Sequence, residues 1–176
     1  GPIAAFEIAA RYVPGAYDLR VMALEPGPVA SSSHALMMAR PLDAEPLDTL
    51  VVAGGDGTRP AALCQRTTAW VAQASARARR TASVCSGAFI LAQAGLLDGR
   101  RATTHWQRCP DFAKRYPKVK LEPDRIFVRD GDIWSSAGIT AGIDLALALI
   151  AEVLGDQGQG KVVARGDAGR TPEEIA

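Results

Sequence analysis

The feature that most constrains the fold is the stretch Thr81–Ala92, where a run of small and β-branched residues leads through one cysteine into an apolar run. This pattern predicts a short buried strand, a tight turn at Cys85 and an apolar helix that starts at once and ends near Ala94. A thiol at such a turn lies beside free backbone N–H groups, and these groups with the helix dipole favour thiolate over thiol. With serine in place of cysteine, the same turn is the nucleophile elbow of hydrolases. The stretch therefore predicts a candidate site centred on Cys85.

Buried strands alternate with amphipathic helices along most of the chain. The predicted strands cover residues 17–24, 48–53, 82–84, 101–104, 119–121, 126–129 and 133–135, with a short edge strand at 34–38. The predicted helices cover residues 3–12, 61–79, 110–116 and 143–154, besides the one after Cys85. Asp130-Gly131 between the last two strands predicts a hairpin. This alternation is typical of an α/β domain with a mostly parallel sheet covered by helices on both faces.

The length of 176 residues fits one domain with a sizeable core. We place that domain at residues 1–155. From residue 156 to 176 the chain is polar and rich in glycine, which predicts a linker or a truncated C-terminal tail. Within it, Thr171–Glu174 has the pattern of a helix start.

Composition and charge exclude several classes of protein. A net charge of +1 gives no reason to expect nucleic acid as a partner of this domain. No apolar run has the length of a membrane span, and the start of the chain has no signal-peptide pattern. Three cysteines without paired spacing suggest a reducing compartment. We therefore expect a cytoplasmic protein.

Three polar or glycine-rich stretches directly follow predicted strands, namely Gly54–Gly57, Cys85–Gly87 and His105-Trp106. In parallel sheets, ligands bind at the carboxyl ends of the strands. We therefore expect these stretches to meet in one site, in which Gly55, Asp56, Ser86, Gly87 and Trp106 bind a ligand beside Cys85 and His105.

Each of these residues also has a plain structural interpretation. A buried cysteine is often a small hydrophobic residue of the core. His105 is the natural base for Cys85 but could equally cap a strand end, and Trp106 could wall a pocket or pack in the core. The glycines at 54–57 could present N–H groups to an oxyanion together with the amide of Ser86, or simply form a turn.

Metals and cofactors are not expected. Cys64, Cys109 and the two histidines, of which His34 is expected at the surface, do not supply a convincing zinc ligand set. The loop after residue 53 has neither the ending of a phosphate-binding loop nor the dinucleotide spacing. A cysteine hydrolase or hydratase needs a second acid or base, and none is obviously placed beside Cys85 unless Asp56 turns inward.

Longer motifs around these residues resemble a known family. Leu50–Gly55 and Ser83–Ala92 resemble the DJ-1/PfpI superfamily. Ala94–Trp106 and Ser136–Leu147 resemble the subgroup that is fused to AraC-type DNA-binding domains, such as the GlxA-like regulators. Isocyanide hydratases, which are enzymes, share much of the same pattern.

The resemblance implies a flavodoxin-like three-layer sandwich that forms a homodimer, with Cys85 at the elbow and His105 nearby. It implies that Gly55 and Ser86 supply the amides facing an anion. In the family, a strand and an acidic residue precede the position of Gly1-Pro2, and that acidic residue bonds near the cysteine. DNA would be contacted only through a domain absent from this chain.

Three functional hypotheses follow. The favoured one is the ligand- or redox-sensing domain of an AraC-type transcriptional regulator, with a small molecule held near Cys85. The alternative is a cysteine-dependent enzyme, a hydratase or hydrolase, acting on a small electrophile such as an isocyanide, an aldehyde or an amide. A third is a stress protein in which Cys85 is merely oxidised.

Overall fold

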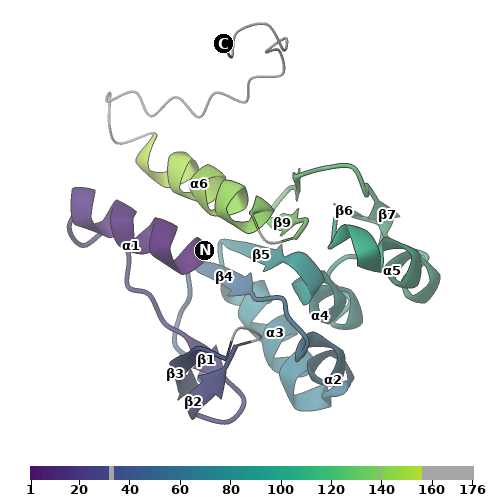
Figure 1. Ribbon diagram of the computed structural model, residues 1–176, viewed down its shortest axis with the longest axis horizontal. Helices are drawn as coiled ribbons and strands as arrows, with labels where there is room; N and C mark the ends of the chain where they lie inside the picture. The colour runs from purple at the N-terminus through teal and green to yellow at the C-terminus, as the bar shows by residue number, and fades with distance from the viewer. Residues whose placement is uncertain (32–33, 139, 156–176) are drawn as a thin grey trace, which may run out of the picture.

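The computed structural model describes residues 1–31, 34–138 and 140–155, and their helices and strands form three layers (Figure 1). The central sheet has the strand order β4 (Thr49–Val52), β5 (Arg80–Val84), β9 (Ile133–Ser136) and β8 (Phe127–Asp130). The first three strands are parallel, and β8 runs antiparallel to β9. The predicted α/β architecture with a mostly parallel central sheet is confirmed.

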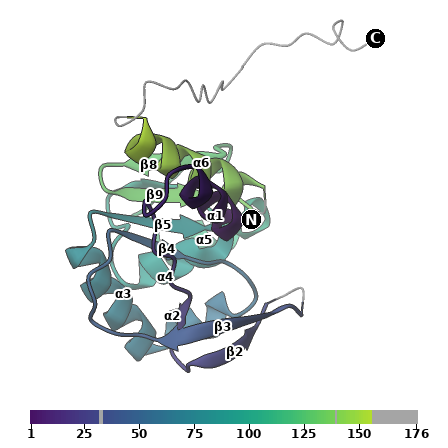
Figure 2. The same cartoon turned by 90° about the vertical axis from the view of Figure 1, so that its left-hand side faces the viewer.

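Helices cover both faces of this sheet, as Figures 1 and 2 show. One face carries α1 (Pro2–Tyr12) and α6 (Ala141–Leu154), which pack against each other. The other carries α2 (Thr58–Leu63), α3 (Gln65–Arg77), α4 (Ala88–Gln93) and α5 (Cys109–Arg115). None of the described helices is both long enough and apolar enough to cross a bilayer.

The alternation of side chains along the strands divides the core in two. Leu50 and Val52 of β4 belong to the core under α2–α5, whereas Val51 packs on the opposite side. Ala82 and Trp134 belong to the core under α1 and α6. Because successive side chains of a strand point to opposite faces, a run of apolar residues fills both cores at once.

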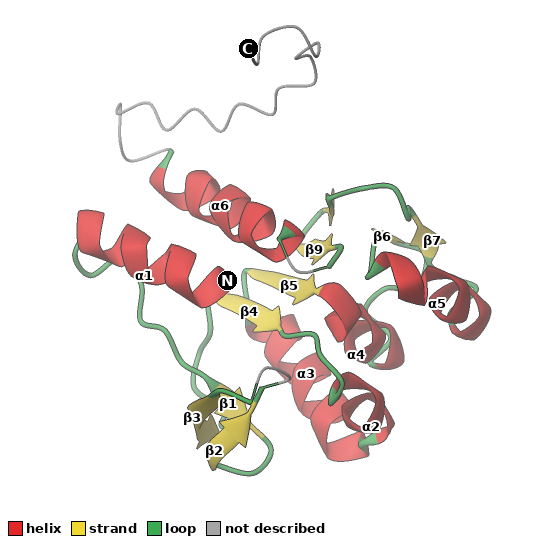
Figure 3. Cartoon of the chain, viewed as in Figure 1, coloured by secondary structure: helices red, strands yellow, loops and turns green. Residues whose placement is uncertain are grey.

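Two smaller sheets flank the central one (Figure 3). The first has the order β1 (Met22–Ala23), β3 (Leu36–Pro41) and β2 (Gly27–Ala30), and the second pairs β6 (Arg101–Ala102) with β7 (Lys120–Leu121). The strand predicted at 17–24 is therefore much shorter than expected. Among the described residues β1 pairs only with β3, and Val21 O accepts one further hydrogen bond from the Arg40 amide of that strand at 2.8 Å.

The prediction of a single helix at 61–79 is wrong, because this segment forms two helices, α2 and α3. Cys64 separates α2 from α3 with an extended backbone, at φ −80° and ψ 109°. Its carbonyl oxygen accepts the first hydrogen bonds of α3, from the amide of Thr68 at 3.1 Å and from the hydroxyl of Thr68 at 3.3 Å. The sequence has no glycine or proline at this break that would predict it.

The hairpin predicted at Asp130-Gly131 is confirmed. Asp130 pairs with Ile133 across the turn, and Gly131 has a φ of 65°, a conformation that glycine adopts at little cost. The final helix begins at Ala141, two residues before the predicted start at Ile143. The predicted tail at 156–176, with its helix start at Thr171–Glu174, lies outside the described residues.

At the amino-terminal ends of β4 and β5, charged residues connect these strands to α6. Arg80 is only 2% exposed, and its guanidinium donates to Thr49 Oγ1 at 2.8 Å and to Glu152 Oε2 of α6 at 2.6 Å. Next to it, the Arg79 guanidinium hydrogen-bonds Asp48 and holds the pKa of that carboxyl below its usual value. These bonds fix α6 against the start of β5.

At the carboxyl ends of the strands, the turn Cys85–Gly87 approaches β4 very closely. A Cβ at position 87 would lie 2.4 Å from the carbonyl oxygen of Val52 and 3.0 Å from that of Ala53. No real Cβ tolerates such contacts with backbone atoms, so only glycine permits this approach.

We predict that Gly87→Ala destabilises the protein by about 2 kcal/mol or more, since the added methyl group overpacks against backbone that cannot move freely. Gly57→Ala is the matched control, because Gly57 has a φ of −67° and no atom lies within 4 Å of the added Cβ. That variant should be neutral or gain up to about 1 kcal/mol. Urea unfolding of both variants gives the comparison, and equal losses would contradict the close approach at position 87.

Candidate functional site

Cys85 adopts a strained backbone conformation at the end of β5. Its φ is 57°, in the left-handed region that side chains other than those of glycine, asparagine and aspartate seldom enter. Such strain persists only where the surroundings hold it, and it is found at functional sites. The combination of a strand, a strained cysteine and a following helix is the geometry of a nucleophile elbow.

The helix after the elbow differs from the prediction. A 3-10 turn, Cys85–Gly87, precedes α4, which spans only Ala88–Gln93. The short α4 contributes a smaller dipole at the thiol than a longer helix would. The geometry of the elbow is therefore a stronger argument for a functional Cys85 than the helix dipole.

Hydrogen bonds and close packing hold Cys85 in place. Its N–H donates to Ala137 O at 3.2 Å, and its carbonyl oxygen accepts a bond from Thr104 Oγ1 at 2.9 Å. Gly54 lies directly against it, because a Cβ there would be 2.7 Å from the Cβ of Cys85. The strained residue is thus fixed from three separate segments of the chain.

Ser86 connects the elbow to the glycine loop after β4. The N–H of Gly55 donates to Ser86 Oγ at 3.0 Å, and that hydroxyl donates in turn to Gly55 O at 3.2 Å. The Gly55 amide, which the sequence predicts to face an anion, is thus engaged within the protein. Gly55 itself has a φ of 127°, which suits glycine.

Beside the elbow lies a cavity of about 410 Å³ that brings most of the predicted residues together. Its volume is in the range typical of small-molecule sites. The predicted residues on its wall are Gly55, Asp56, Cys85, Ser86 and His105. Thr58, Arg59, Phe89, Gln107 and Arg108 complete the lining, and the sequence analysis did not single them out.

Two residues predicted to bind a ligand are not part of this wall. Gly87 is buried against Val52 O, so its place is structural. Trp106 is 67% exposed and stacks on His105, with ring centroids 5.8 Å apart and an interplanar angle of 27°. The 3-10 turn that begins at Trp106 directs its ring to the surface beside the cavity.

His105 packs tightly within the site. A Cβ at Gly138 would lie 2.3 Å from the Cδ2 atom of the imidazole, so glycine at 138 makes room for the ring. The carbonyl oxygen of His105 accepts a hydrogen bond from Cys109 Sγ at 3.6 Å. Both Cys85 and His105 face the same cavity, the arrangement that a thiol and its base require.

Asp56 supplies a carboxylate on the cavity wall. The sequence offers no acid beside Cys85 other than Asp56, and Asp56 is an exposed residue at the border of the cavity. The site therefore offers a thiol, an imidazole and a carboxylate within one hollow, which are the groups of general acid–base and nucleophilic catalysis.

The other two cysteines lie outside this cavity. Burial raises the pKa of the Cys109 thiol, which therefore stays protonated and donates to backbone oxygens. The hydroxyl of Thr67 lowers the pKa of Cys64, which lies at the start of α3. In the described part of the chain, no three His, Cys, Asp or Glu side chains gather in a way that could hold a metal ion.

The residues that the sequence analysis missed had weak signals in the sequence. Arg59 closely follows the glycine loop that ends at Gly57, and Arg108 lies one turn after His105. Neither forms a motif with its neighbours. They were identifiable only as cations next to predicted strand ends.

Because Cys85 is held at a positive φ, we predict that Cys85→Gly has a free energy of unfolding about 1 kcal/mol higher than Cys85→Ala. Both variants lose the thiol, so their difference reports on the backbone strain of a residue with a Cβ at this φ, reduced by the larger unfolded-state entropy of glycine. Chemical denaturation of the two proteins measures it. An alanine variant that is more stable than the glycine variant by about 0.4–1 kcal/mol, the usual difference at an unstrained position, would show that Cys85 is not strained.

Comparison with known proteins gives relatives of two kinds. The chain is 42% identical over 115 residues to isonitrile hydratase of Pseudomonas putida, covering 64% of this chain and 48% of that protein. It is 36% identical over 154 residues to the HTH-type transcriptional regulator CdhR of Pseudomonas aeruginosa, covering 85% of this chain and 45% of that protein. The chain thus spans about half the length of these curated relatives.

Solved structures share the fold. A THiJ/PfpI family protein from Pseudomonas syringae superimposes with a TM-score of 0.75 at 28% identity, covering 94% of this chain and 73% of that one. This match confirms the predicted flavodoxin-like sandwich. The DJ-1/PfpI family matches residues 2–152, nearly the whole described part of the chain. The motifs around Cys85 and His105 thus led to the correct family, and the chain belongs to the DJ-1/PfpI family.

Proposed function

We propose that this domain binds a small molecule over Cys85 and is the sensing part of an AraC-type transcriptional regulator. The observation that carries the proposal is the cavity of about 410 Å³, whose wall combines the strained Cys85 with His105 and Asp56. The similarity to a transcriptional regulator over 85% of the chain supports it.

In this proposal Cys85 detects the ligand and His105 acts as its base or hydrogen-bond partner. Ser86 remains the candidate for an anion-facing amide, since the Gly55 amide already donates to Ser86 Oγ. Ligand or oxidant near the thiol would alter the contacts of the elbow with Gly54 and Ala137. Binding of a ligand at Cys85 could therefore change the backbone conformation of the elbow.

The proposal includes a homodimer that transmits occupancy to DNA through a domain outside residues 1–155. Exposed apolar side chains on α1 and α6 favour such an assembly, among them Ile3, Ile143 and Leu147, which are 37%, 39% and 48% exposed. Large apolar side chains left at the surface mark contact sites when they gather.

The second candidate function is a cysteine-dependent hydratase, and the position of Asp56 favours it. Hydration of an isonitrile adds one water and yields an N-substituted formamide. The thiolate of Cys85 would attack the isonitrile carbon, and an acid would protonate that carbon. Water would then displace the thiolate. Asp56 and His105 are the groups available to move these protons.

We expect a small electrophile that binds the site to raise the thermal midpoint of the wild-type protein without being consumed. At 100 times the dissociation constant, binding adds about 2.7 kcal/mol, which corresponds to a shift of roughly 5–10 °C for a chain of this size. The panel contains an isonitrile, a glyoxal and an amide, with product formation followed in parallel.

Cys85→Ala should lose most of the shift, whereas Cys64→Ala should keep it, because Cys64 lies outside the cavity lining. A shift that survives Cys85→Ala would contradict ligand binding over the thiol. Turnover of the isonitrile by wild-type protein, and not by Cys85→Ala, would contradict the sensing function and support the hydratase function.

A further inference from the structure

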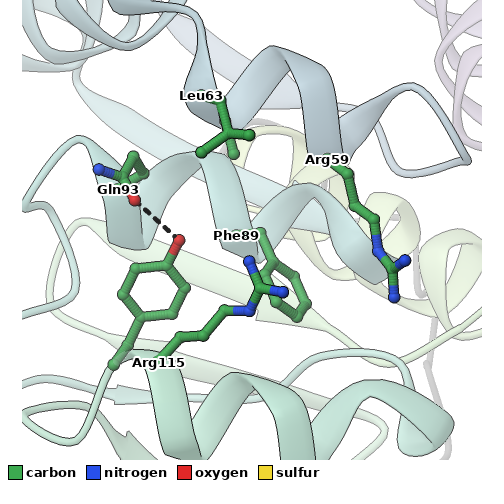
Figure 4. Close-up of a pocket in the computed structure, with 7 residues that line it drawn as sticks. Arg59, Leu63, Phe89, Gln93 and Arg115 are labelled. Carbon is green, nitrogen blue, oxygen red and sulfur yellow. Dashed lines mark hydrogen bonds between the residues drawn. The ribbon is translucent and has the colours of Figure 1, made fainter.

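Two cavities adjoin at the site and share the residues Arg59 and Phe89. Besides the hollow beside Cys85, a second one of about 230 Å³ lies between α2, α4 and α5. Figure 4 shows Arg59 and Arg115 reaching toward it from α2 and α5, with Phe89 between them. A second hollow, lined by Arg59 and Arg115, thus lies next to the cysteine site, with Arg59 and Phe89 bordering both.

Two of the arginines at the site have no ion-pair partner. Arg59 and Arg108 both line the cavity of Cys85, and in the described ranges neither forms a salt bridge or a side-chain hydrogen bond. Arg115 differs, because it pairs with Asp111 at 2.8 Å. Two guanidinium groups beside the thiol are therefore free to bind an anion.

The acidic groups nearby do not neutralise them. The pKa of Asp111 is lowered, first by its hydrogen bond with Arg115 and then, through space, by Arg115, Arg59 and Arg108. One carboxylate thus lies among three guanidinium groups and is already hydrogen-bonded to one of them. Asp56 is the other acid on the cavity wall, so positive charge remains in excess around the thiol.

We propose that the small molecule bound over Cys85 carries an anionic group, most simply a carboxylate, which Arg59 and Arg108 hold. This inference rests on the proposed function and specifies its ligand. Guanidinium groups match carboxylates with paired, charge-assisted hydrogen bonds. Phe89, which borders both cavities, supplies an apolar surface for the rest of the ligand.

Alkylation of Cys85 by two reagents of similar size tests the inference. Iodoacetate is an anion and iodoacetamide is neutral, and each forms one S–C bond at the thiolate and releases iodide. We expect the rate ratio of iodoacetate to iodoacetamide at Cys85 to exceed that of N-acetylcysteine about tenfold at low salt, because two nearby cations attract the anion. Mass spectrometry of the Cys85 peptide separates this rate from those of Cys64 and Cys109.

Arg59→Gln and Arg108→Gln should each lower the ratio, and added salt should lower it in the wild type. Arg77→Gln, on the exposed last turn of α3, removes the same charge outside both cavity linings and should leave the ratio unchanged. A Cys85 that reacts with both reagents at the ratio of N-acetylcysteine overturns the anion site and leaves the proposed function standing.

A Cys85 that reacts with neither reagent contradicts the proposed function instead. Calorimetric titration with oxalate then decides the role of the arginines without the thiol. Heat of binding that is lost in Arg59→Gln and kept in Arg77→Gln supports the anion site, and no binding to the wild type overturns it.

Discussion

The structure of the site depends on the close approach of two backbone turns at the carboxyl ends of β4 and β5. Gly54 and Gly87 make it possible, since a Cβ at either position would lie within 2.7 Å of the facing segment. Interiors of proteins are packed without spare volume, so such contacts fix relative positions firmly. The approach lets Ser86 Oγ reach the backbone of Gly55 and closes the elbow against the glycine loop.

The close approach of these two turns determines how Cys85 is presented to the cavity. The elbow keeps Cys85 at a φ of 57°, and the bonds from Thr104 and to Ala137 hold it there. The loop that packs against the elbow also contributes Asp56 to the cavity wall, and the segment after β6 contributes His105. The ends of the parallel strands β4 and β5, together with the segment after β6 of the separate two-stranded sheet, thus place Asp56, Cys85 and His105 around one hollow.

The sequence predicted the central sheet, the elbow and most of the cavity wall, because these features depend on local patterns. Apolar strands followed by glycine or polar residues indicate both the fold and the edge of the sheet at which ligands bind. It failed where the outcome depends on distant partners. Only Met22 and Ala23 of the strand predicted at 17–24 pair with β3. The break at Cys64 has no local signal, and the free guanidinium groups of Arg59 and Arg108 are recognisable only once the cavity is known.

The rate at which iodoacetamide alkylates Cys85 in Gly54→Ala tests most directly whether this close approach makes the thiol reactive. The added Cβ would lie 2.7 Å from the Cβ of Cys85 and 2.7 Å from Val84 O, so the elbow must shift. We predict that the rate falls roughly tenfold or more in this variant, a rise of about 1.4 kcal/mol in the activation free energy, and is unchanged in Gly57→Ala. A folded Gly54→Ala protein whose Cys85 reacts at the wild-type rate would contradict the account.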